Sequence, residues 1–65
     1  MKEMSEIEKI RRHIGLSRKS FGAIVGRKWQ SIWHYDRGEK EVPEKIMDRA
    51  RRLYEFVVNM QEEDR

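Results

Sequence analysis

The chain has 65 residues, of which 42% are charged and 37% hydrophobic, and it carries a net charge of +3. A chain of this length forms one domain at most, residues 1–65. It buries only about 60% of its unfolded surface, so a second subunit is the expected support. The absence of cysteine excludes a disulfide and a thiolate metal site, and no apolar run approaches the roughly 20 residues that a membrane span needs.

The first predicted helix begins after Ser5 and ends at Gly15. Ser5 and Glu8 have the spacing of a capping box, in which the hydroxyl accepts from a backbone amide and the glutamate reaches back. Gly15 suits the left-handed conformation that ends many helices. One apolar stripe at helical spacing predicts the buried face: Ile7, Ile10 and Ile14.

Two short helices are predicted next. Ser17 is a favoured N-cap for a helix that runs to about Val25, and Gly26 stops it. A third helix is expected from about Lys28 to Asp36. The residues expected to face inward are Phe21, Ile24 and Val25 on the first of the two, and Ile32 and Tyr35 on the second.

The last predicted helix is long, covering residues 43–60. Pro43 is expected at its first helical position, where a missing amide hydrogen costs nothing. Residues 61–65 are expected to form a polar, frayed tail. The main apolar stripe comprises Ile46, Ala50, Leu53, Tyr54 and Val57, and a second apolar edge comprises Phe56 and Met60. No strand pattern is visible in the sequence, which therefore predicts an all-α bundle of about four helices.

The pair of short helices over residues 17–36 has the arrangement of a helix-turn-helix. About three residues separate them, and a glycine stands in the joint. In this arrangement the first helix lies across the DNA backbone and the second enters the major groove. Inward residues on both helices must fix the angle between them: Phe21, Val25, Ile32 and Tyr35.

Positive charge is concentrated in the middle of the chain. Residues 9–40 contain nine basic and two acidic residues, whereas the remainder contains six basic and ten acidic residues. A basic middle between acidic ends is typical of a surface that binds a polyanion, although an ordinary solvated surface is the alternative.

Residues 10–26, IRRHIGLSRKSFGAIVG, resemble the start of the lambda repressor-like and Cro-like helix-turn-helix family of phage repressors, the xenobiotic-response-element type. Residues 31–38, SIWHYDRG, resemble the segment that follows in that family, and Val42-Pro43 resembles its subsequent proline. The resemblance covers about half the chain. It departs from the family pattern at Arg18, Gly22 and Arg27, and in having four predicted helices where the family usually has five.

The resemblance implies a role for individual residues of this chain. Base edges are expected to be contacted by Trp29, Gln30, Ser31 and His34, and DNA phosphates by Arg18, Lys19, Arg27, Lys28, Arg37 and Lys40. The chemistry is suitable, since glutamine can bond adenine at two atoms and basic side chains bind phosphate. The alternative is that Gln30, Ser31 and His34 are ordinary solvated residues. Trp29, like Trp33, has the alternative of being a core or dimer residue.

Other residues have simpler interpretations. We expect Trp33 to be packed, and Arg11, Arg12 and His13 to be solvated. The arginines of the last helix are expected on its wet side, paired with acids at helical spacing: Arg49, Arg51 and Arg52 with Asp48 and Glu55.

The leading hypothesis is a homodimeric transcriptional repressor of a phage or mobile-element operon that binds an inverted repeat in double-stranded DNA. Its expected dimer face comprises Leu53, Phe56, Val57 and Met60. Alternatively, Phe56 and Met60 cover the first helix. A further alternative is an antitoxin-like module whose last helix binds a second protein.

We expect no enzyme. No glycine-rich phosphate loop is present, and the side chains of residues two apart on a helix, such as His34 and Asp36, point in different directions. The N-terminus lacks the apolar core of a signal peptide, so the protein is expected in the cytoplasm. No metal site and no cofactor site are expected.

Overall fold

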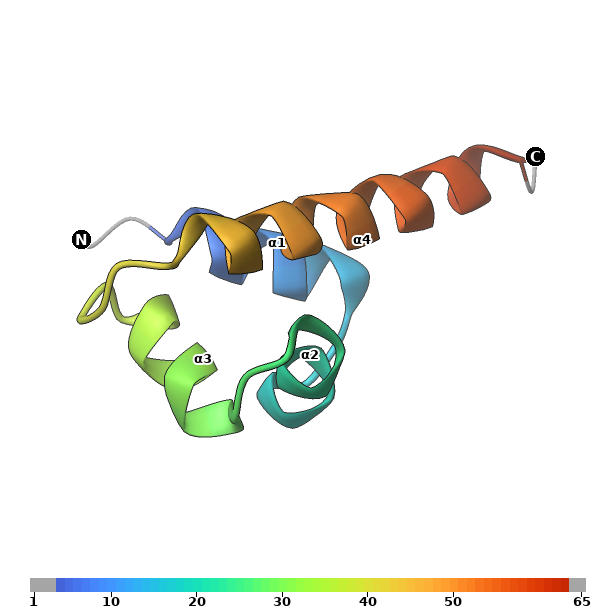
Figure 1. Ribbon diagram of the computed structural model, residues 1–65. Coiled ribbons are helices and arrows are strands. Elements are labelled where there is room, and N and C mark those ends of the chain that lie inside the picture. Colours follow the sequence, from blue (N-terminus) through green and yellow to red (C-terminus); the bar gives the residue numbers. More distant parts are fainter. Residues whose placement is uncertain (1–3, 64–65) are drawn as a thin grey trace.

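A computed structural model describes residues 4–63, and this part of the chain is all-helical. The four helices are α1 (Glu6–Ile14), α2 (Arg18–Val25), α3 (Trp29–Asp36) and α4 (Glu44–Glu63). Figure 1 shows α4 running along one side of the molecule with α2 and α3 on the other and α1 alongside α4. The C-terminal part of α4 projects past the other three helices. The predicted fold class is therefore confirmed.

The predicted helix boundaries are confirmed for the first two helices. The hydroxyl oxygen of Ser5 accepts from the amide of Glu8 at 3.2 Å, and that of Ser17 accepts from the amide of Ser20 at 3.1 Å. Gly15 and Gly26 end these helices with φ values of 84° and 86°, in the left-handed region that favours glycine. The carboxylate of Glu8 pairs with Arg12 at 2.9 Å.

Two predicted boundaries of α4 were wrong. Pro43 precedes the first helical residue and acts as the cap, because its carbonyl oxygen accepts from the amides of Ile46 and Met47, each at 3.0 Å. The helix also continues past Met60 to Glu63, where a frayed tail was expected. Glutamine and glutamate have good helix propensity, and no glycine or proline follows to stop the helix. The last two residues of that predicted tail lie outside the described part.

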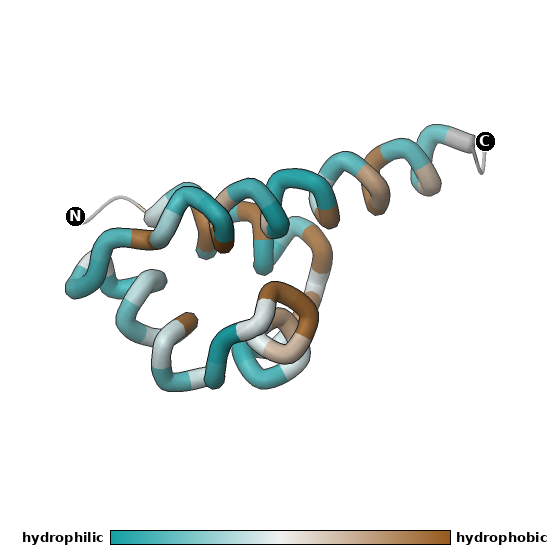
Figure 2. Tube along the Cα trace, viewed as in Figure 1, coloured by the Kyte–Doolittle hydropathy of each residue, from teal (hydrophilic) through white to brown (hydrophobic). Residues whose placement is uncertain are grey.

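All four helices contribute to one core. Its buried residues are Ile7, Ile10, Phe21, Val25, Ile32, Tyr35, Ile46 and Ala50. This confirms the predicted inward residues of both short helices except Ile24, whose side chain is 54% exposed. Figure 2 shows that the hydrophobic stretches of the helices alternate with hydrophilic ones and that apolar positions continue into the projecting part of α4.

Gly22 allows α2 and α3 to meet across a very tight turn. Its carbonyl oxygen accepts from the amides of Gly26 and Arg27, both at 2.8 Å. A Cβ atom added at Gly22 would lie 2.4 Å from the carbonyl oxygen of Arg27 and 3.3 Å from a side-chain carbon of Ile32. A side chain at this position is therefore excluded by sterics, which explains why a glycine stands within α2.

Arg49 fixes the same turn from the opposite side. It is exposed, as expected for the wet side of the last helix, and in addition its Nη1 donates to the carbonyl oxygen of Val25 at 3.0 Å. This bond satisfies a carbonyl at the C-terminal end of α2 and ties that end to α4. Arg51 pairs with Glu6 rather than with a neighbour on its own helix, and only Arg52 forms the expected local pair, with Asp48 at 3.1 Å.

Candidate nucleic-acid interface

Helix α3 is only about two turns long, and it has one buried side and one exposed side. Ile32 and Tyr35 are buried, whereas Trp29 is half exposed and Gln30 is exposed. Ser31 and His34 are only partly exposed. The structure thus brings all four predicted base-reading residues to one short helix, with the two at its start the most accessible.

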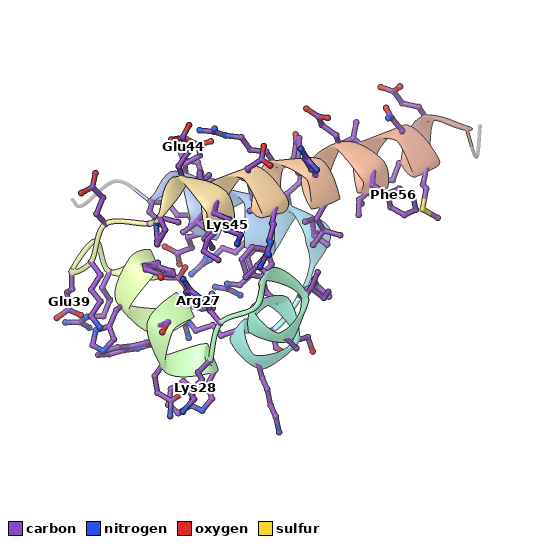
Figure 3. All side chains as sticks on the ribbon, in the orientation of Figure 1. Arg27, Lys28, Glu39, Glu44, Lys45 and Phe56 are labelled. Atoms are coloured by element: carbon purple, nitrogen blue, oxygen red, sulfur yellow. The ribbon has the colours of Figure 1, made fainter. Side chains whose placement is uncertain are left out.

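Lys28 precedes α3 as its N-cap and makes no side-chain capping bond. Figure 3 places Lys28 at the edge of the molecule farthest from α4. Arg27, one residue earlier, is exposed and donates to the carbonyl oxygen of Gly26 at 3.2 Å. The joint between α2 and α3 therefore presents two basic side chains next to the exposed start of α3.

Two shallow, open hollows lie on either side of Trp29. The first is between the starts of α2 and α3, and its lining residues are Arg11, Ser17, Arg18, Lys19 and Trp29. The second is on the outer face of α3, and its lining residues are Trp29, Gln30, Trp33 and His34. The half-exposed indole of Trp29 is thus the ridge between a basic hollow and an aromatic one.

Trp33 was expected to be packed, and it is half-buried. Two neighbouring side chains contact its ring. The guanidinium carbon of Arg37 lies 4.5 Å from the centre of the Trp33 ring, within the range of a cation–π contact. The His34 ring lies 5.0 Å away in an edge-to-face arrangement. Arg37, a predicted phosphate contact, is therefore engaged with an aromatic ring.

Glu39 ties these neighbours together. Its Oε1 accepts from Nε of Arg37 at 2.7 Å and lies 3.5 Å from Nδ1 of His34. The hydrogen bond from Arg37 is the largest cause that holds the pKa of the Glu39 carboxyl below its ordinary value, followed by the charge of Arg37 and a contribution from His34. The end of α3 and the following turn therefore form one connected cluster.

Arg11 and Asp36 were not expected to have a structural role, and Arg11 was expected to be solvated. That prediction was wrong, because Arg11 is buried. Its Nη2 donates to Oδ2 of Asp36 at 3.2 Å, and its Nη1 donates to the carbonyl oxygen of Leu16 at 2.9 Å. Arg18, a predicted phosphate contact, donates through Nε to the same oxygen of Asp36 at 2.8 Å while its side chain remains 39% exposed.

The sequence contained a signal for this pair. Arg11 stands four residues after Ile7 and three before Ile14, so it occupies the inward stripe of α1. Asp36 stands four residues after Ile32 on the inward stripe of α3. Opposite charges on two inward faces indicate a buried ion pair.

The pairing of Asp36 leaves the surface of α2 and α3 without an exposed carboxylate. It is the sole acid in residues 9–38, and its side chain is only 2% exposed. Among residues 4–63, no ion pair involves the remaining predicted phosphate contacts, which are all exposed: Lys19, Arg27, Lys28 and Lys40. The start of α2 and the joint before α3 therefore present basic side chains without an ion pair, whereas the exposed carboxylate of Glu39 lies against the far end of α3.

The predicted dimer face begins where α4 still packs on the core, at Leu53, and continues toward the C-terminal end of the helix. Phe56 is 62% and Met60 53% exposed, while Leu53 and Val57 are half-buried. The alternative that Phe56 and Met60 cover α1 is wrong, because both side chains remain exposed. Figure 3 shows Phe56 on the side of α4 that faces the same direction as α2, beyond the end of the compact part. His13, expected to be solvated, is exposed but its ring lies 5.0 Å from that of Tyr54.

Within residues 4–63, no cluster of three or more histidine or acidic side chains has the geometry to hold a metal ion. None of the described helices is both long and apolar enough to cross a membrane. Comparison of the chain with family models, curated proteins and solved structures finds no match.

Proposed function

We propose that this protein is a cytoplasmic, sequence-specific DNA-binding repressor that inserts α3 into the major groove and binds an inverted repeat as a homodimer. Regulation of a phage or mobile-element operon is the part of this proposal that depends on the family resemblance alone. The arrangement of α2 and α3, with a three-residue joint and outward-facing polar residues on α3, suits this mode of binding.

The observation that carries the proposal is the absence of an exposed carboxylate on residues 9–38, together with the exposed basic side chains there. A DNA duplex carries a dense row of phosphates, and exposed acids facing it would oppose binding. The single acid of this stretch is neutralised inside the fold by two arginines. The surface that remains is positive around the start of α3.

A homodimer is supported by the apolar residues of the projecting part of α4. The apolar stripe begins at Leu53, which packs against the core, and continues through Phe56, Val57 and Met60. Its two largest members, Phe56 and Met60, are mostly exposed. A two-fold pairing through this stripe would bury it and present two copies of α3 to one duplex. Half-sites about 34 Å apart are required for two copies of α3 to enter successive turns of the major groove on one face of the duplex.

The test combines the oligomeric state with DNA selection. Sedimentation of the protein alone is expected to show a dimer, and selection from random duplexes is expected to enrich an inverted repeat with half-sites about one helical turn apart. Affinity for the enriched site should fall with salt, with a logarithmic slope of about −0.9 for each phosphate neutralised. Failure to enrich any sequence would contradict the proposal.

The same apolar stripe favours a second candidate function, in which α4 grips a different protein in the manner of an antitoxin. In that case the isolated protein would sediment as a monomer and would not enrich an inverted repeat. Its basic surface would then give only affinity that does not depend on DNA sequence.

A further inference from the structure

The aromatic hollow on the outer face of α3 has a composition that limits what it can recognise. Its walls are the indole rings of Trp29 and Trp33, with the amide of Gln30 and the ring of His34 beside them. An exposed tryptophan is uncommon on a protein surface, and here the exposed Trp29 and the half-buried Trp33 border one depression. The hollow therefore offers apolar contact in the middle of a surface that is otherwise basic and polar.

We infer that this hollow takes the C5-methyl group of a thymine, so that α3 reads an A·T base pair through both an apolar and a polar contact. This inference rests on the proposed function. The thymine methyl is the one apolar group that the bases of B-DNA display in the major groove, where the other edge groups are hydrogen-bond donors and acceptors. An apolar depression on a groove-reading helix is therefore matched by thymine rather than by cytosine, whose ring lacks the methyl.

The amide of Gln30 supplies the polar half of the contact. A glutamine side chain has both a donor and an acceptor, which suits the N6 and N7 atoms of adenine. Gln30 is exposed and lies at the edge of the hollow, so both groups are available to a base. One short stretch of α3 can thus address the adenine edge and a thymine methyl together.

The far wall of the hollow is held in place before DNA arrives. Arg37 stacks on the Trp33 ring at 4.5 Å, His34 packs against its edge, and Glu39 holds Arg37 at 2.7 Å. A wall that is already ordered loses little conformational entropy when a base contacts it. Glu39 and Arg37 therefore act as positioning residues for thymine recognition.

The test removes the methyl group alone. In the duplex enriched by selection, each thymine is replaced in turn by deoxyuridine, which pairs with adenine in the same way. Dissociation constants are measured by fluorescence anisotropy at one salt concentration. At one thymine position in each half-site, deoxyuridine is expected to weaken binding about three- to tenfold, the effect of losing the burial of one methyl group.

Protein variants then assign the effect to the hollow. Trp29→Ala and the more conservative Trp33→Phe are each expected to reduce the ratio of the two dissociation constants toward one, with circular dichroism confirming that the variants are folded. Lys28→Ala is the matched control. It is expected to weaken binding to the thymine and uridine duplexes equally and to leave their ratio unchanged.

Two results would overturn the inference while the proposed function stands. One is an enriched duplex in which no single deoxyuridine changes affinity by more than about twofold, well below the effect of a buried methyl group. The other is a deoxyuridine effect that persists in both tryptophan variants, since the methyl would then be read elsewhere. Failure of the selection itself contradicts the proposed function, and this outcome is distinct from both.

Discussion

Nη2 of Arg11 lies 3.2 Å from Oδ2 of Asp36, and this ion pair joins α1 to α3 inside the fold. The Arg11 side chain is 11% exposed and that of Asp36 only 2%. Arg18, at the start of α2, donates to the same carboxylate oxygen. One buried acid therefore connects three of the four helices, and its burial leaves no exposed carboxylate within residues 9–38.

Asp36→Asn is expected to lower the free energy of unfolding by about 3–5 kcal/mol, because it leaves the buried guanidinium of Arg11 without an opposite charge. Urea denaturation followed by circular dichroism measures the change. Arg52→Met is the control, since Arg52 and its partner Asp48 are exposed, and an exposed pair at this spacing contributes about 0.5 kcal/mol or less. Equal losses in the two variants would contradict a special role for the buried pair.

The double variant Arg11→Met with Asp36→Leu is expected to be more stable than Asp36→Asn. Within the described part of the chain, Nε of Arg11 and Oδ1 of Asp36 have no hydrogen-bond partner, so the pair is incompletely satisfied. Replacement of such a pair by apolar residues is often neutral or stabilising. A double variant as unstable as the single one would show that both charges are needed for packing and not only for each other.

Gly22→Ala is expected to destabilise the protein, although helix propensity alone predicts a gain of about 1 kcal/mol. The added methyl group would lie 2.4 Å from the carbonyl oxygen of Arg27, and backbone there must shift to relieve the contact. We expect a loss of about 1–3 kcal/mol in denaturation experiments, typical of overpacking.

The neighbouring exposed residue provides the matched control for that substitution. Ala23→Gly is expected to cost about 0.5–1 kcal/mol through propensity alone, since the Ala23 side chain is exposed on α2. If Gly22→Ala instead raised stability, the two helices would not approach each other as closely at this turn as the structure shows.

Most of the fold could be predicted because the signals are local. Ser5, Ser17, Gly15 and Gly26 mark the ends of α1 and α2, and caps depend only on residues within one helical turn. The buried positions of α2 and α3 followed from spacing, except for Ile24. Ile24 is next to the inward stripe in sequence, and whether such a border position is covered depends on how far the neighbouring helix extends.

The roles of the arginines could not be predicted in the same way. Arg11 was expected in solvent, yet it stands on the inward stripe of α1 and is buried. Arg49 is exposed as expected, but it also bonds to a carbonyl of α2. Their partners, Asp36 and the carbonyl of Val25, are 25 and 24 residues distant. Charge type alone suggests exposure. For Arg11, the inward spacing of Arg11 and Asp36 was the signal in the sequence, whereas only the three-dimensional arrangement brings the carbonyl of Val25 to Arg49.

Part of the candidate site could be predicted because it depends on the same local signals as the helices. Trp29, Gln30 and Lys28 have the expected exposure, because they start a short helix whose inward residues were correctly identified. The engagement of Arg37 with Trp33 and Glu39 was not expected. It depends on the turn after α3, where Gly38 has a φ of 73° and lets the chain bring Glu39 back toward α3.

The pKa of Glu6 is expected to rise toward its ordinary value in Arg51→Met. The hydrogen bond from Arg51 is the largest cause that lowers this pKa in the folded protein, and the charges of Arg51 and Lys9 add to it. A lowered folded-state pKa means that the pair stabilises the fold above the ordinary carboxyl pKa and that this contribution is lost as the pH falls through the lowered one. Carboxyl NMR titration gives the value directly, and Arg52→Met should leave it unchanged.

Phe56→Glu is expected to convert the protein to a monomer and to weaken binding to the full inverted repeat more than to a single half-site. The side chain is 62% exposed in the protomer, so the protomer should retain its helical circular dichroism. Glu55→Gln, on a neighbouring exposed position of the same helix, is the control for a change of charge. A Phe56→Glu protein that still sediments as a dimer would exclude this part of α4 as the interface.

Gln30→Ala and Lys28→Ala are expected to weaken DNA binding in two different ways, although the residues are two positions apart. Loss of a two-bond contact to adenine should cost about 1–3 kcal/mol on the preferred sequence and relax the preference at one base position. Loss of a phosphate contact should weaken all sequences alike and reduce the salt slope by about one unit. Binding of each variant to the selected site and to its single-base substitutions, at several salt concentrations, separates the two effects. If Gln30→Ala weakened binding equally on every sequence, Gln30 would contact the DNA backbone and not a base edge. The adenine of the recognised A·T pair would then have to be contacted by a different polar group.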